Sequence, residues 1–531
     1  MKRKNKNGHI KTGRNFTVPD SLLHRPAPFR TDGVAFAESP HSATCEIRKP
    51  GLVCQALGSD SRDSQVQYIS TRGEAPKIGF EDVLLAGLAS DGGLYVPESW
   101  PQFTSDEIAA MAGRPYAETA FRVMSPFMGD FLTESEFSAM IKAAYASFHH
   151  PAVTPLVQSG DNEWVLELFR GPTLAFKDVA MQILGRVMDH ALTRRGQKAT
   201  VVCATSGDTG GAAIEAYRGR EAADIFVLHP NGQVSEVQRR QMTTAKDANV
   251  HNIAIDGTFD DCQALLKAMF NTPALRSELS LAGVNSINWA RIIAQVVYYF
   301  TAATALGAPH RAVSFTVPTG NFGDIFAGWV ARQMGLPVER LRIATNVNDI
   351  LHRALSTGRY EVGRVQPTAS PSMDIQVSSN FERLLFELGG RDAGGLRRQM
   401  DGLAQSGAFE IPAGTLAAMR ALFSSARVDE AETAATIAAV YEECGLLIDP
   451  HTAVGVHAAR QGLTQSAAPM VVLATAHPAK FPDAVEAATG QRPALPPHLA
   501  DLLERKERFT VLPNDFETVS SFIGANARAA Q

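Results

Sequence analysis

Cysteine is scarce in this chain of 531 residues, and no two cysteines are spaced as a CxxC pair. The five that occur are scattered, as Cys45, Cys54, Cys203, Cys262 and Cys444. An odd and scattered set argues against a disulfide framework and against a thiolate zinc site. The cysteine pattern therefore favours a reducing compartment, and we expect a cytoplasmic protein.

Long apolar runs and an excess of positive charge are also missing. No uninterrupted apolar stretch approaches the ~20 residues that a membrane-spanning helix needs. The formal net charge is −5, which gives no reason to expect a nucleic-acid or acidic-membrane partner. With 45% hydrophobic and 20% charged residues, the composition is that of an ordinary soluble globular protein. The length allows a large core in two or three lobes.

Several ligand-binding signatures are absent from the sequence. It contains neither GxxxxGK[ST] nor GxGxxG, so nucleotide-binding loops are not indicated. His451 and His477 do not form an HExxH pair, and no metal is implied.

Residues 1–65 differ in character from the rest. They are rich in Ser, Pro, Gly and Arg and show no helical or strand periodicity. Such a segment cannot bury enough apolar surface to offset its chain entropy. A targeting peptide is the alternative, but a secretory apolar centre and a clear Arg-rich amphipathic helix are both missing. We therefore expect a disordered N-terminal extension.

The remaining chain predicts three parts. Residues 66–160 show helical patterns and should form a mainly helical N-terminal domain. Residues 161–490 alternate short apolar β-rich runs with amphipathic helices, which is the signature of βαβ units around a buried parallel sheet. We expect an α/β core of two lobes with a cleft between them, followed by a C-terminal helical segment at 491–531.

Some of these expected elements are sharply delimited. Helices are expected at Phe80–Ala89, Ser105–Ala112, Glu134–Tyr145, Gly210–Tyr217, Ser235–Thr243, Asp260–Phe270, Trp289–Ala305 and Asp324–Met334. Strands are expected at Trp164–Leu168, Ala199–Cys203, Asp224–Leu228, His251–Ile255, Ala312–Val317, Leu341–Ala344 and Met470–Leu473.

Lys177 is the most informative single residue. Its neighbours Leu174, Ala175, Phe176 and Val179 are apolar, and burial disfavours the ammonium form of a lysine and frees a nucleophilic amine. A Schiff-base enzyme needs such a lysine. The alternative is a lysine whose stem lies on apolar surface with its head in water.

Two glycine-rich loops stand at expected strand-to-helix junctions, where ligands bind in such folds. The loop Ala204–Ala212 offers hydroxyls and free helix N–H groups to a carboxylate or phosphate. The loop Val317–Asp324 has Gly320 and Gly323, which allow backbone N–H groups to surround one phosphate. The alternatives are a Ser/Thr-capped helix for the first loop and a plain turn with an Asp cap for the second.

Three further polar clusters could serve the same cleft. In Asn285–Arg291 the side chains of Ser286, Asn288 and Arg291 could clamp an anionic substrate group, or the first two could only cap a helix. The loop Ile448–Gly455 should expose Asp449, His451 and Thr452 to the cleft. The run Ala474–Phe481 again follows an apolar strand.

Taken together, these motifs resemble a known family. The chain contains, in this order, YISTRG, DGGLYVP, GPTLAFKD, TSGDTGGAA, SINWARI, PTGNFGD, DPHTAVG and HPAKF. This series, from about Gln67 to Pro482, closely resembles the threonine synthases of fungi and many bacteria. The resemblance implies the fold-type II pyridoxal-phosphate architecture shared with tryptophan synthase β chains. One departure is Arg170, which stands where the family motif usually has His.

The resemblance also implies a role for each matching residue. Lys177 would hold pyridoxal 5′-phosphate covalently and act as the catalytic base. The residues implied for the cofactor phosphate are Gly320, Asn321, Phe322 and Gly323, with Asp324 completing the loop. Thr452 would contact the pyridine nitrogen, with Asp449 as the competing candidate. The residues implied for the substrate are Thr205, Ser206, Asp208 and Thr209 at its carboxylate, and Ser286, Asn288 and Arg291 at its phosphate.

The implied reaction is that of a pyridoxal-phosphate-dependent carbon–oxygen lyase. It converts O-phospho-L-homoserine and water into L-threonine and phosphate by γ-elimination and β-addition of water, as the last step of threonine biosynthesis. The alternative is a related phospho-lyase that releases phosphate and 2-oxobutyrate. We expect a monomer or homodimer that binds this small molecule and neither nucleic acid nor membrane.

Overall fold

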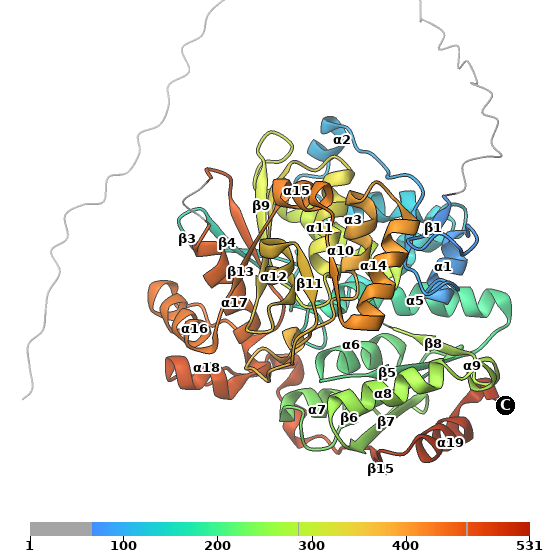
Figure 1. Ribbon diagram of the computed structural model, residues 1–531. Helices are drawn as coiled ribbons and strands as arrows, with labels where there is room; N and C mark the ends of the chain where they lie inside the picture. Colours follow the sequence, from blue (N-terminus) through green and yellow to red (C-terminus); the bar gives the residue numbers. More distant parts are fainter. Residues whose placement is uncertain (1–65, 285, 463–465, 531) are drawn as a thin grey trace, which may run out of the picture. The chain divides into compact units, whose positions relative to one another are not determined.

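The computed structural model describes residues 66–284, 286–462 and 466–530 (Figure 1). The chain divides into two units, Met1–Asp60 and Ser61–Gln531, and everything below concerns the second. The expected N-terminal extension at 1–65 lies outside the described residues.

The first part of the described chain is mainly helical. Strands β1 (Tyr68–Ser70) and β2 (Tyr95–Pro97) form a small antiparallel pair. The helices are α1 (Phe80–Ala86), α2 (Ser105–Ala109), α3 (Tyr116–Met124) and α4 (Glu134–Tyr145). Capping boxes begin α2 and α4, where Thr104 and Thr133 each accept a hydrogen bond from the backbone three residues on. Because such caps can be read from sequence, both helix starts agree with the prediction.

A six-stranded sheet forms the first α/β lobe, in the order β13-β10-β9-β14-β4-β3. All neighbouring pairs are parallel except β3 with β4. The strands are β3 (Leu156–Gly160), β4 (Glu163–Glu167), β9 (Val313–Pro318), β10 (Val338–Thr345), β13 (Phe423–Arg427) and β14 (Met470–Ala474). Strands β9 and β14 are buried on both faces, which explains their continuous apolar runs.

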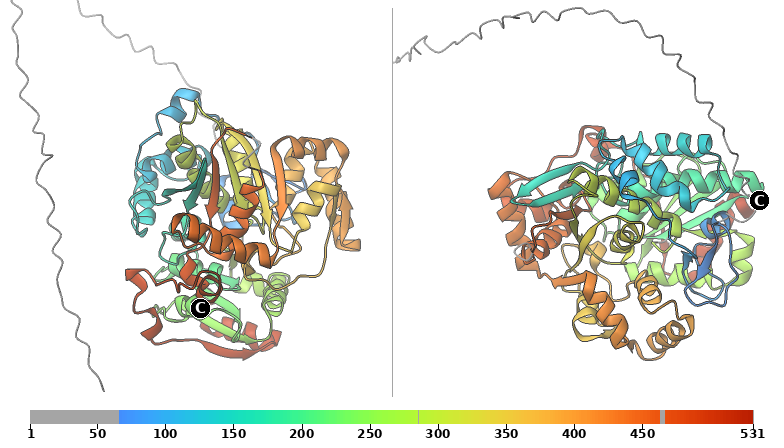
Figure 2. Two further views of the ribbon diagram at one scale, coloured as in Figure 1. Left: turned by 90° about the vertical axis from the view of Figure 1, so that its left-hand side faces the viewer. Right: turned by 90° about the horizontal axis from the view of Figure 1, so that it is seen from above.

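A parallel five-stranded sheet forms the second lobe, in the order β15-β7-β6-β5-β8. Its strands are β5 (Ala199–Ala204), β6 (Ala223–Pro230), β7 (Val250–Asp256), β8 (Leu281–Gly283) and β15 (Thr510–Pro513). Figure 2 shows this sheet, in green and red, and the first sheet as separate layers with helices around them.

The C-terminal segment, expected to be helical, contains a strand as well as a helix. Strand β15 pairs with β7 in parallel, and only then does α19 (Phe516–Asn526) follow. Val519 and Ile523 of α19 are buried in a cluster with the strands of the second sheet. The sequence around β15 shows no long apolar run because this edge strand is half-exposed, with Val511 47% accessible. The expected boundaries at 160 and 490 remain predictions.

Helices α5 (Lys177–Arg195), α10 (Trp289–Ala305) and α11 (Gly323–Gln333) lie in the main core. Of these, α5 was not among the expected helices. Its first turns are buried on all sides, so the sequence shows no amphipathic stripe there.

The other helices complete the covering of the sheets. Around the second sheet lie α6 (Asp208–Tyr217), α7 (Glu236–Thr243), α8 (Phe259–Phe270) and α9 (Pro273–Glu278). The remaining elements are α12 (Ile350–Thr357), β11 (Arg359–Glu361), α13 (Phe381–Leu388), α14 (Ala393–Ser406), β12 (Ala408–Glu410), α15 (Ala413–Leu422), α16 (Glu430–Cys444), α17 (Pro450–Arg460) and α18 (Pro482–Thr489). None of the helices within the described ranges combines the length and apolarity that a membrane crossing requires.

Candidate active site

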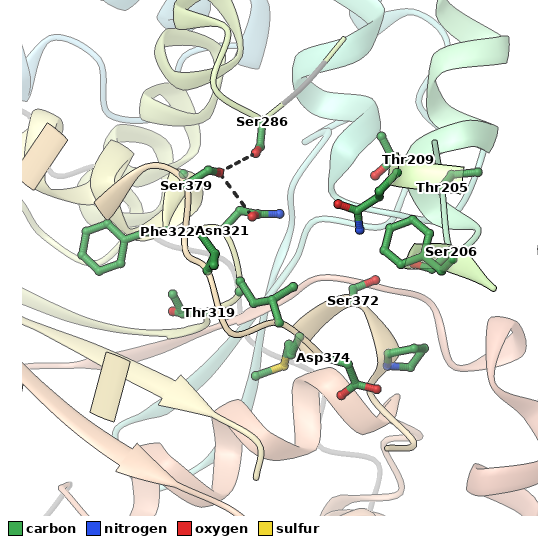
Figure 3. Close-up of a pocket in the computed structure, with 18 of the residues that line it drawn as sticks. Thr205, Ser206, Thr209, Ser286, Thr319, Asn321, Phe322, Ser372, Asp374 and Ser379 are labelled. Carbon is green, nitrogen blue, oxygen red and sulfur yellow. Dashed lines mark hydrogen bonds between the residues drawn. The ribbon is translucent and has the colours of Figure 1, made fainter. Parts of the chain in front are cut away.

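A cavity of about 640 Å³ lies where both parallel sheets end. Its lining includes the loop after β5, the loop after β9, and Thr475 after β14. Figure 3 shows Thr205, Ser206 and Thr209 on one wall and Ser286, Asn321 and Ser379 on the opposite wall. Both glycine-rich loops predicted from the sequence therefore face one space at the carboxyl ends of the strands.

Lys177 enters this cavity from the first position of α5. The preceding chain is tied to the β14 end, because Phe176 donates its N–H to the Thr475 carbonyl at 2.8 Å. The lysine is 8% exposed, and its Nζ lies over the Phe176 ring, 4.7 Å from the ring centre. Burial lowers the pKa of Lys177; the nearby Asp208 carboxylate opposes this shift, while Lys480 and Arg291 add to it. The arrangement favours a neutral, nucleophilic amine.

Asp208, at the start of α6, lies between two lysines. Its Oδ2 is 3.3 Å from Nζ of Lys177, and its Oδ1 is 2.7 Å from Nζ of Lys480. Gln238 donates from Nε2 to the same Oδ1 at 2.8 Å, and the Ser372 hydroxyl donates to Oδ2 at 3.4 Å. Burial alone would raise the pKa of Asp208, but the two lysines hold it well below its usual range. Asp208 is therefore a buried carboxylate anion beside the Lys177 amine.

The loop from Gly320 to Gly323 forms a cradle of free backbone donors. Within the described part of the chain, the N–H groups of Gly320, Asn321 and Phe322 donate to no other group. The carbonyls of Gly320 and Asn321 are instead held by Ser378 and Asn380 on the facing loop. A Cβ at Gly320 would come within 2.9 Å of the Ser372 carbonyl. This cradle at the N-terminus of α11 suits a phosphate group.

Two side chains predicted for this loop point away from the cavity centre. Phe322 has a left-handed backbone (φ 64°) and buries its ring against Phe381 and Phe423. Figure 3 shows that ring directed away from the wall of Thr205. These two contacts fix the Phe322 side chain in the core, so this residue offers a ligand its backbone N–H and not its ring.

Asp324 also points into the protein core. Its Oδ1 accepts hydrogen bonds from the hydroxyls of Tyr298 and Tyr299, while its Oδ2 is buried with no hydrogen-bond partner among the described residues. Burial raises the pKa of Asp324 to about 7, against the opposing effect of the two tyrosine hydroxyls. Asp324 therefore supports the loop from below and shifts towards its protonated form.

The loop after β5 is organised by Thr205. Its Oγ1 accepts hydrogen bonds from the N–H groups of Gly207 and Gly210, both at 2.9 Å. Gly207 has φ 137°, and a Cβ there would lie 2.6 Å from the Gln238 side chain, so glycine is required. Ser206 and Thr209 line the cavity, and within the described residues their hydroxyls have no protein partner. This wall can donate to an anion.

The cluster before α10 divides into two kinds of residue. Ser286 lies 3.3 Å from the Ser379 hydroxyl and lines the cavity, as does Arg291. Arg291 is 4% exposed, donates from Nη1 to the Val284 carbonyl at 3.1 Å, and leaves Nε buried without a partner within the described ranges. Asn288 is not part of the lining: it caps α10 and donates to the Leu84 carbonyl. The hydrogen bonds of Asn288 are therefore those of a helix cap, which is the alternative to substrate binding that the sequence left open.

The loop opening α17 brings His451 to the cavity, whereas Asp449 and Thr452, which we also expected there, are not part of its lining. Asp449 caps α17 and accepts from the Thr452 hydroxyl and, at 2.6 Å, from Nδ1 of His451. The Ser372 N–H donates to His451 Nε2 at 3.2 Å. With Nδ1 donating and Nε2 accepting, this histidine has one defined tautomer. Thr452 and Asp449 are fully buried beneath it.

Sequence reasoning gave no role to Lys480, Gln238 or Ser372, which hold Asp208. Lys480 lies in the run HPAKF, where a lysine between Ala479 and Phe481 carries the same apolar signal as Lys177. Arg170, the departure from the family pattern, donates from Nε to Glu167 at 2.7 Å and lies over the Phe169 ring. It is not part of the cavity lining.

Comparison with known families identifies the architecture. Family models described as "Threonine synthase N terminus", "Pyridoxal-phosphate dependent enzyme" and "Threonine synthase, C-terminal" match residues 67–145, 148–476 and 452–523. The chain is thus a pyridoxal-phosphate-dependent enzyme of fold type II, as the sequence predicted. The free cradle N–H groups and the buried amine of Lys177 fit that cofactor.

Individual relatives agree. A threonine synthase of Pseudomonas aeruginosa is 57% identical over 86% of this chain and 98% of its own. One from Saccharomyces cerevisiae is 41% identical over 87% and 98%. The crystal structure of a pyridoxal-phosphate-bound threonine synthase from Brucella melitensis, 60% identical, covers 87% of this chain and 100% of its own with a TM-score of 0.85. The yeast enzyme structure gives a TM-score of 0.83 at 38% identity, over 87% and 99%.

Proposed function

The chain belongs to the threonine synthase family, and we propose that its cavity converts O-phospho-L-homoserine and water into L-threonine and phosphate. The observation that carries this proposal is the position of Lys177. Its buried amine opens onto a space between two separate glycine-rich loops. One loop can hold a cofactor phosphate while the other holds a substrate acid, which is the arrangement that a pyridoxal-phosphate lysine needs.

The cofactor side of the site is assigned to three groups. Lys177 forms the covalent link, and the cradle Gly320–Gly323 holds the phosphate with Asp324 supporting it from below. We assign the ring nitrogen to Thr452, with Asp449 as the competing candidate. Since the Thr452 hydroxyl donates to Asp449 in this structure, contact with the ring would require that bond to be exchanged.

The substrate side is assigned to the wall formed by Thr205, Ser206 and Thr209 and to the residues at the start of α10. Thr205, Ser206 and Thr209, together with the Asp208 backbone, hold the substrate carboxylate through hydroxyl and N–H donors. Arg291 and Ser286 bind the substrate phosphate, and Arg291 has a free Nε for this purpose. Asn288 contributes by fixing the start of α10.

The chemistry requires repeated proton transfers beside one amine. When bound, the cofactor supplies the conjugated system that stabilises negative charge formed at the substrate α carbon. When not linked to the cofactor, the Lys177 amine would accept the α proton of the substrate and return protons to it. Burial keeps bulk water from competing for this amine.

The test is Lys177→Met in the full-length protein. Threonine formation from O-phospho-L-homoserine should fall at least ~10³-fold, and no cofactor should be trapped on the protein by borohydride. Lys198→Met, at an exposed position after α5, is the matched control. Threonine and 2-oxobutyrate are measured together. Release of 2-oxobutyrate without threonine from the wild-type protein would instead establish the phospho-lyase activity.

We also propose that the protein acts in the cytoplasm, as a monomer or homodimer, without nucleic-acid or membrane partners. The support is the scattered cysteines and the net charge of −5.

A further inference from the structure

Lys480 is a lysine with no exposed surface (0%), at the end of the short turn Pro478–Lys480 after β14. Its Nζ lies 2.7 Å from Oδ1 of Asp208 and donates to the Thr173 carbonyl at 2.8 Å. An unpaired ammonium at such a position would cost several kcal/mol, and a buried carboxylate would cost as much. Lys480 and Asp208 therefore stabilise each other in their charged forms.

The other oxygen of Asp208 faces the reactive amine, 3.3 Å from Nζ of Lys177. The Asp208 carboxylate thus lies between Lys480, which has no exposed surface, and Lys177, which lines the cavity. With Lys177 as its only cationic partner, the carboxylate would favour the ammonium form of that residue. An ammonium is neither a nucleophile nor a base. The positive charge of Lys480 offsets this attraction.

We propose that Lys480 is the fixed counter-ion of Asp208, a positioning residue that holds this carboxylate beside Lys177 while leaving the Lys177 amine free to react. The assignment rests on the proposed function only in taking Lys177 as the reactive amine. Gln238 and Ser372 hold the same carboxylate through neutral donors. Charge and hydrogen bonding can therefore be separated by mutation.

Several other charged or titratable groups face this cluster and stay unchanged in the variants below. They are Arg291 on α10, Asp324 on α11, His451 on α17, Asp178 on α5 and, directly before the turn that carries Lys480, His477. A shift caused by Lys480→Met is then attributable to the lost ammonium.

The experiment measures the pH above which the Lys177 amine reacts. Full-length protein is freed of cofactor, mixed with pyridoxal 5′-phosphate between pH 6 and pH 10, and trapped with borohydride for peptide mass analysis. In Lys480→Met the midpoint of the rate–pH profile should move up by at least about one pH unit. Below both midpoints this means an approximately tenfold slower reaction at Lys177.

Two further variants separate charge from packing. Gln238→Leu removes a neutral donor to Asp208, so its midpoint should stay within ~0.3 unit of wild type. The double variant Asp208→Asn/Lys480→Met removes both charges, and replacement of a whole buried pair is commonly tolerated. Its midpoint should return to within ~0.5 unit of wild type.

Each outcome decides the proposal. A folded Lys480→Met protein with a wild-type midpoint overturns it. If the single variant is insoluble, a soluble double variant with a near-wild-type midpoint supports the counter-ion assignment, and an insoluble double variant overturns it. Failure of the wild-type protein to form threonine would reject the proposed function but leave these midpoints measurable.

Discussion

Replacing Asp324 by Asn tests whether the carboxyl group beneath the phosphate cradle makes stability depend on pH. Burial raises the pKa of Asp324 from 3.8 to about 7. Below about pH 4 the group is protonated in both the folded and the unfolded chain. Between pH 4 and pH 7 the unfolded chain releases this proton while the folded protein keeps it, so stability falls as pH rises. Above about pH 7 both states are ionised and the effect levels off.

The magnitude follows from the size of the shift. Each pH unit between the two pKa values changes the free energy of unfolding by about 1.4 kcal/mol. From pH 5 to pH 7 the wild-type protein should therefore lose roughly 2 to 3 kcal/mol through this group. An Asn side chain has no charge to bury, and its oxygen can still accept from Tyr298 and Tyr299. Its amide lacks a partner at the Oδ2 position, which adds a cost of about 1 kcal/mol that does not depend on pH.

The assay is urea unfolding of the cofactor-free protein, followed by tryptophan fluorescence at pH 5, 6, 7 and 8. The stability of Asp324→Asn minus that of wild type should rise by roughly 2 to 3 kcal/mol between pH 5 and pH 7 and then stay level. Asp178, whose pKa burial also raises to about 7, is common to both proteins and cancels. Asp161→Asn, in an exposed turn, is the control. Parallel profiles for Asp324→Asn and wild type would refute the reasoning.

Four further substitutions test other parts of the structure. Arg383→Met should cost roughly 3 to 5 kcal/mol in urea unfolding, because it leaves two buried backbone carbonyls and a side-chain amide oxygen without their donor; a cost below about 1 kcal/mol would contradict this. Gly328→Ala places a Cβ 2.7 Å from the buried Tyr299 ring and should lower the free energy of unfolding by ~1 to 3 kcal/mol. Gly414→Ala adds a Cβ in open space within a helix and should raise the free energy of unfolding by up to ~1 kcal/mol. Equal effects of the two substitutions would argue against the packing described. Arg170→Ala removes the partly exposed partner of the buried Glu167 carboxylate and should cost roughly 1 to 3 kcal/mol of stability, while threonine formation should change by less than about threefold; a larger loss of activity would place Arg170 in the reaction.

Local sequence signals predicted much of the fold. Helices α4 and α10 begin and end at the expected residues, because a cap precedes each helix and an apolar stripe or run continues to its end. The strands buried on both faces were also found, since their apolar runs are bounded by polar loops. Strand β15 was missed because only its pairing with β7 makes it a strand. Half-exposed and four residues long, it has no pattern of its own.

The candidate site likewise has features that the sequence predicted and features that it did not. The glycine loops after β5 and β9 were predicted because their signal is local, and parallel strands bring their carboxyl ends to one edge. The direction of each side chain was not predictable. Asn288 and Thr452 have the residue types of a binding site, yet their hydrogen bonds serve helix capping and Asp449. Which polar group faces a cavity depends on the packing behind it.

The choice of Asp rather than Asn at position 208 shows why such packing matters for chemistry. An Asn could accept from Gln238 through its oxygen and donate from its amide nitrogen to the Ser372 hydroxyl oxygen, so hydrogen bonding to these two residues alone does not require a charge. The negative charge of Asp208 is matched by the positive charge of Lys480. Because Lys480 has no exposed surface, its charge can be balanced only by another group inside the protein. With Asp208 anionic and Lys480 cationic, the pair adds no net charge beside Lys177. The neutral form of the Lys177 amine then leaves no uncompensated charge in the core, whereas its ammonium form adds one, so the pair favours the form that can accept a proton.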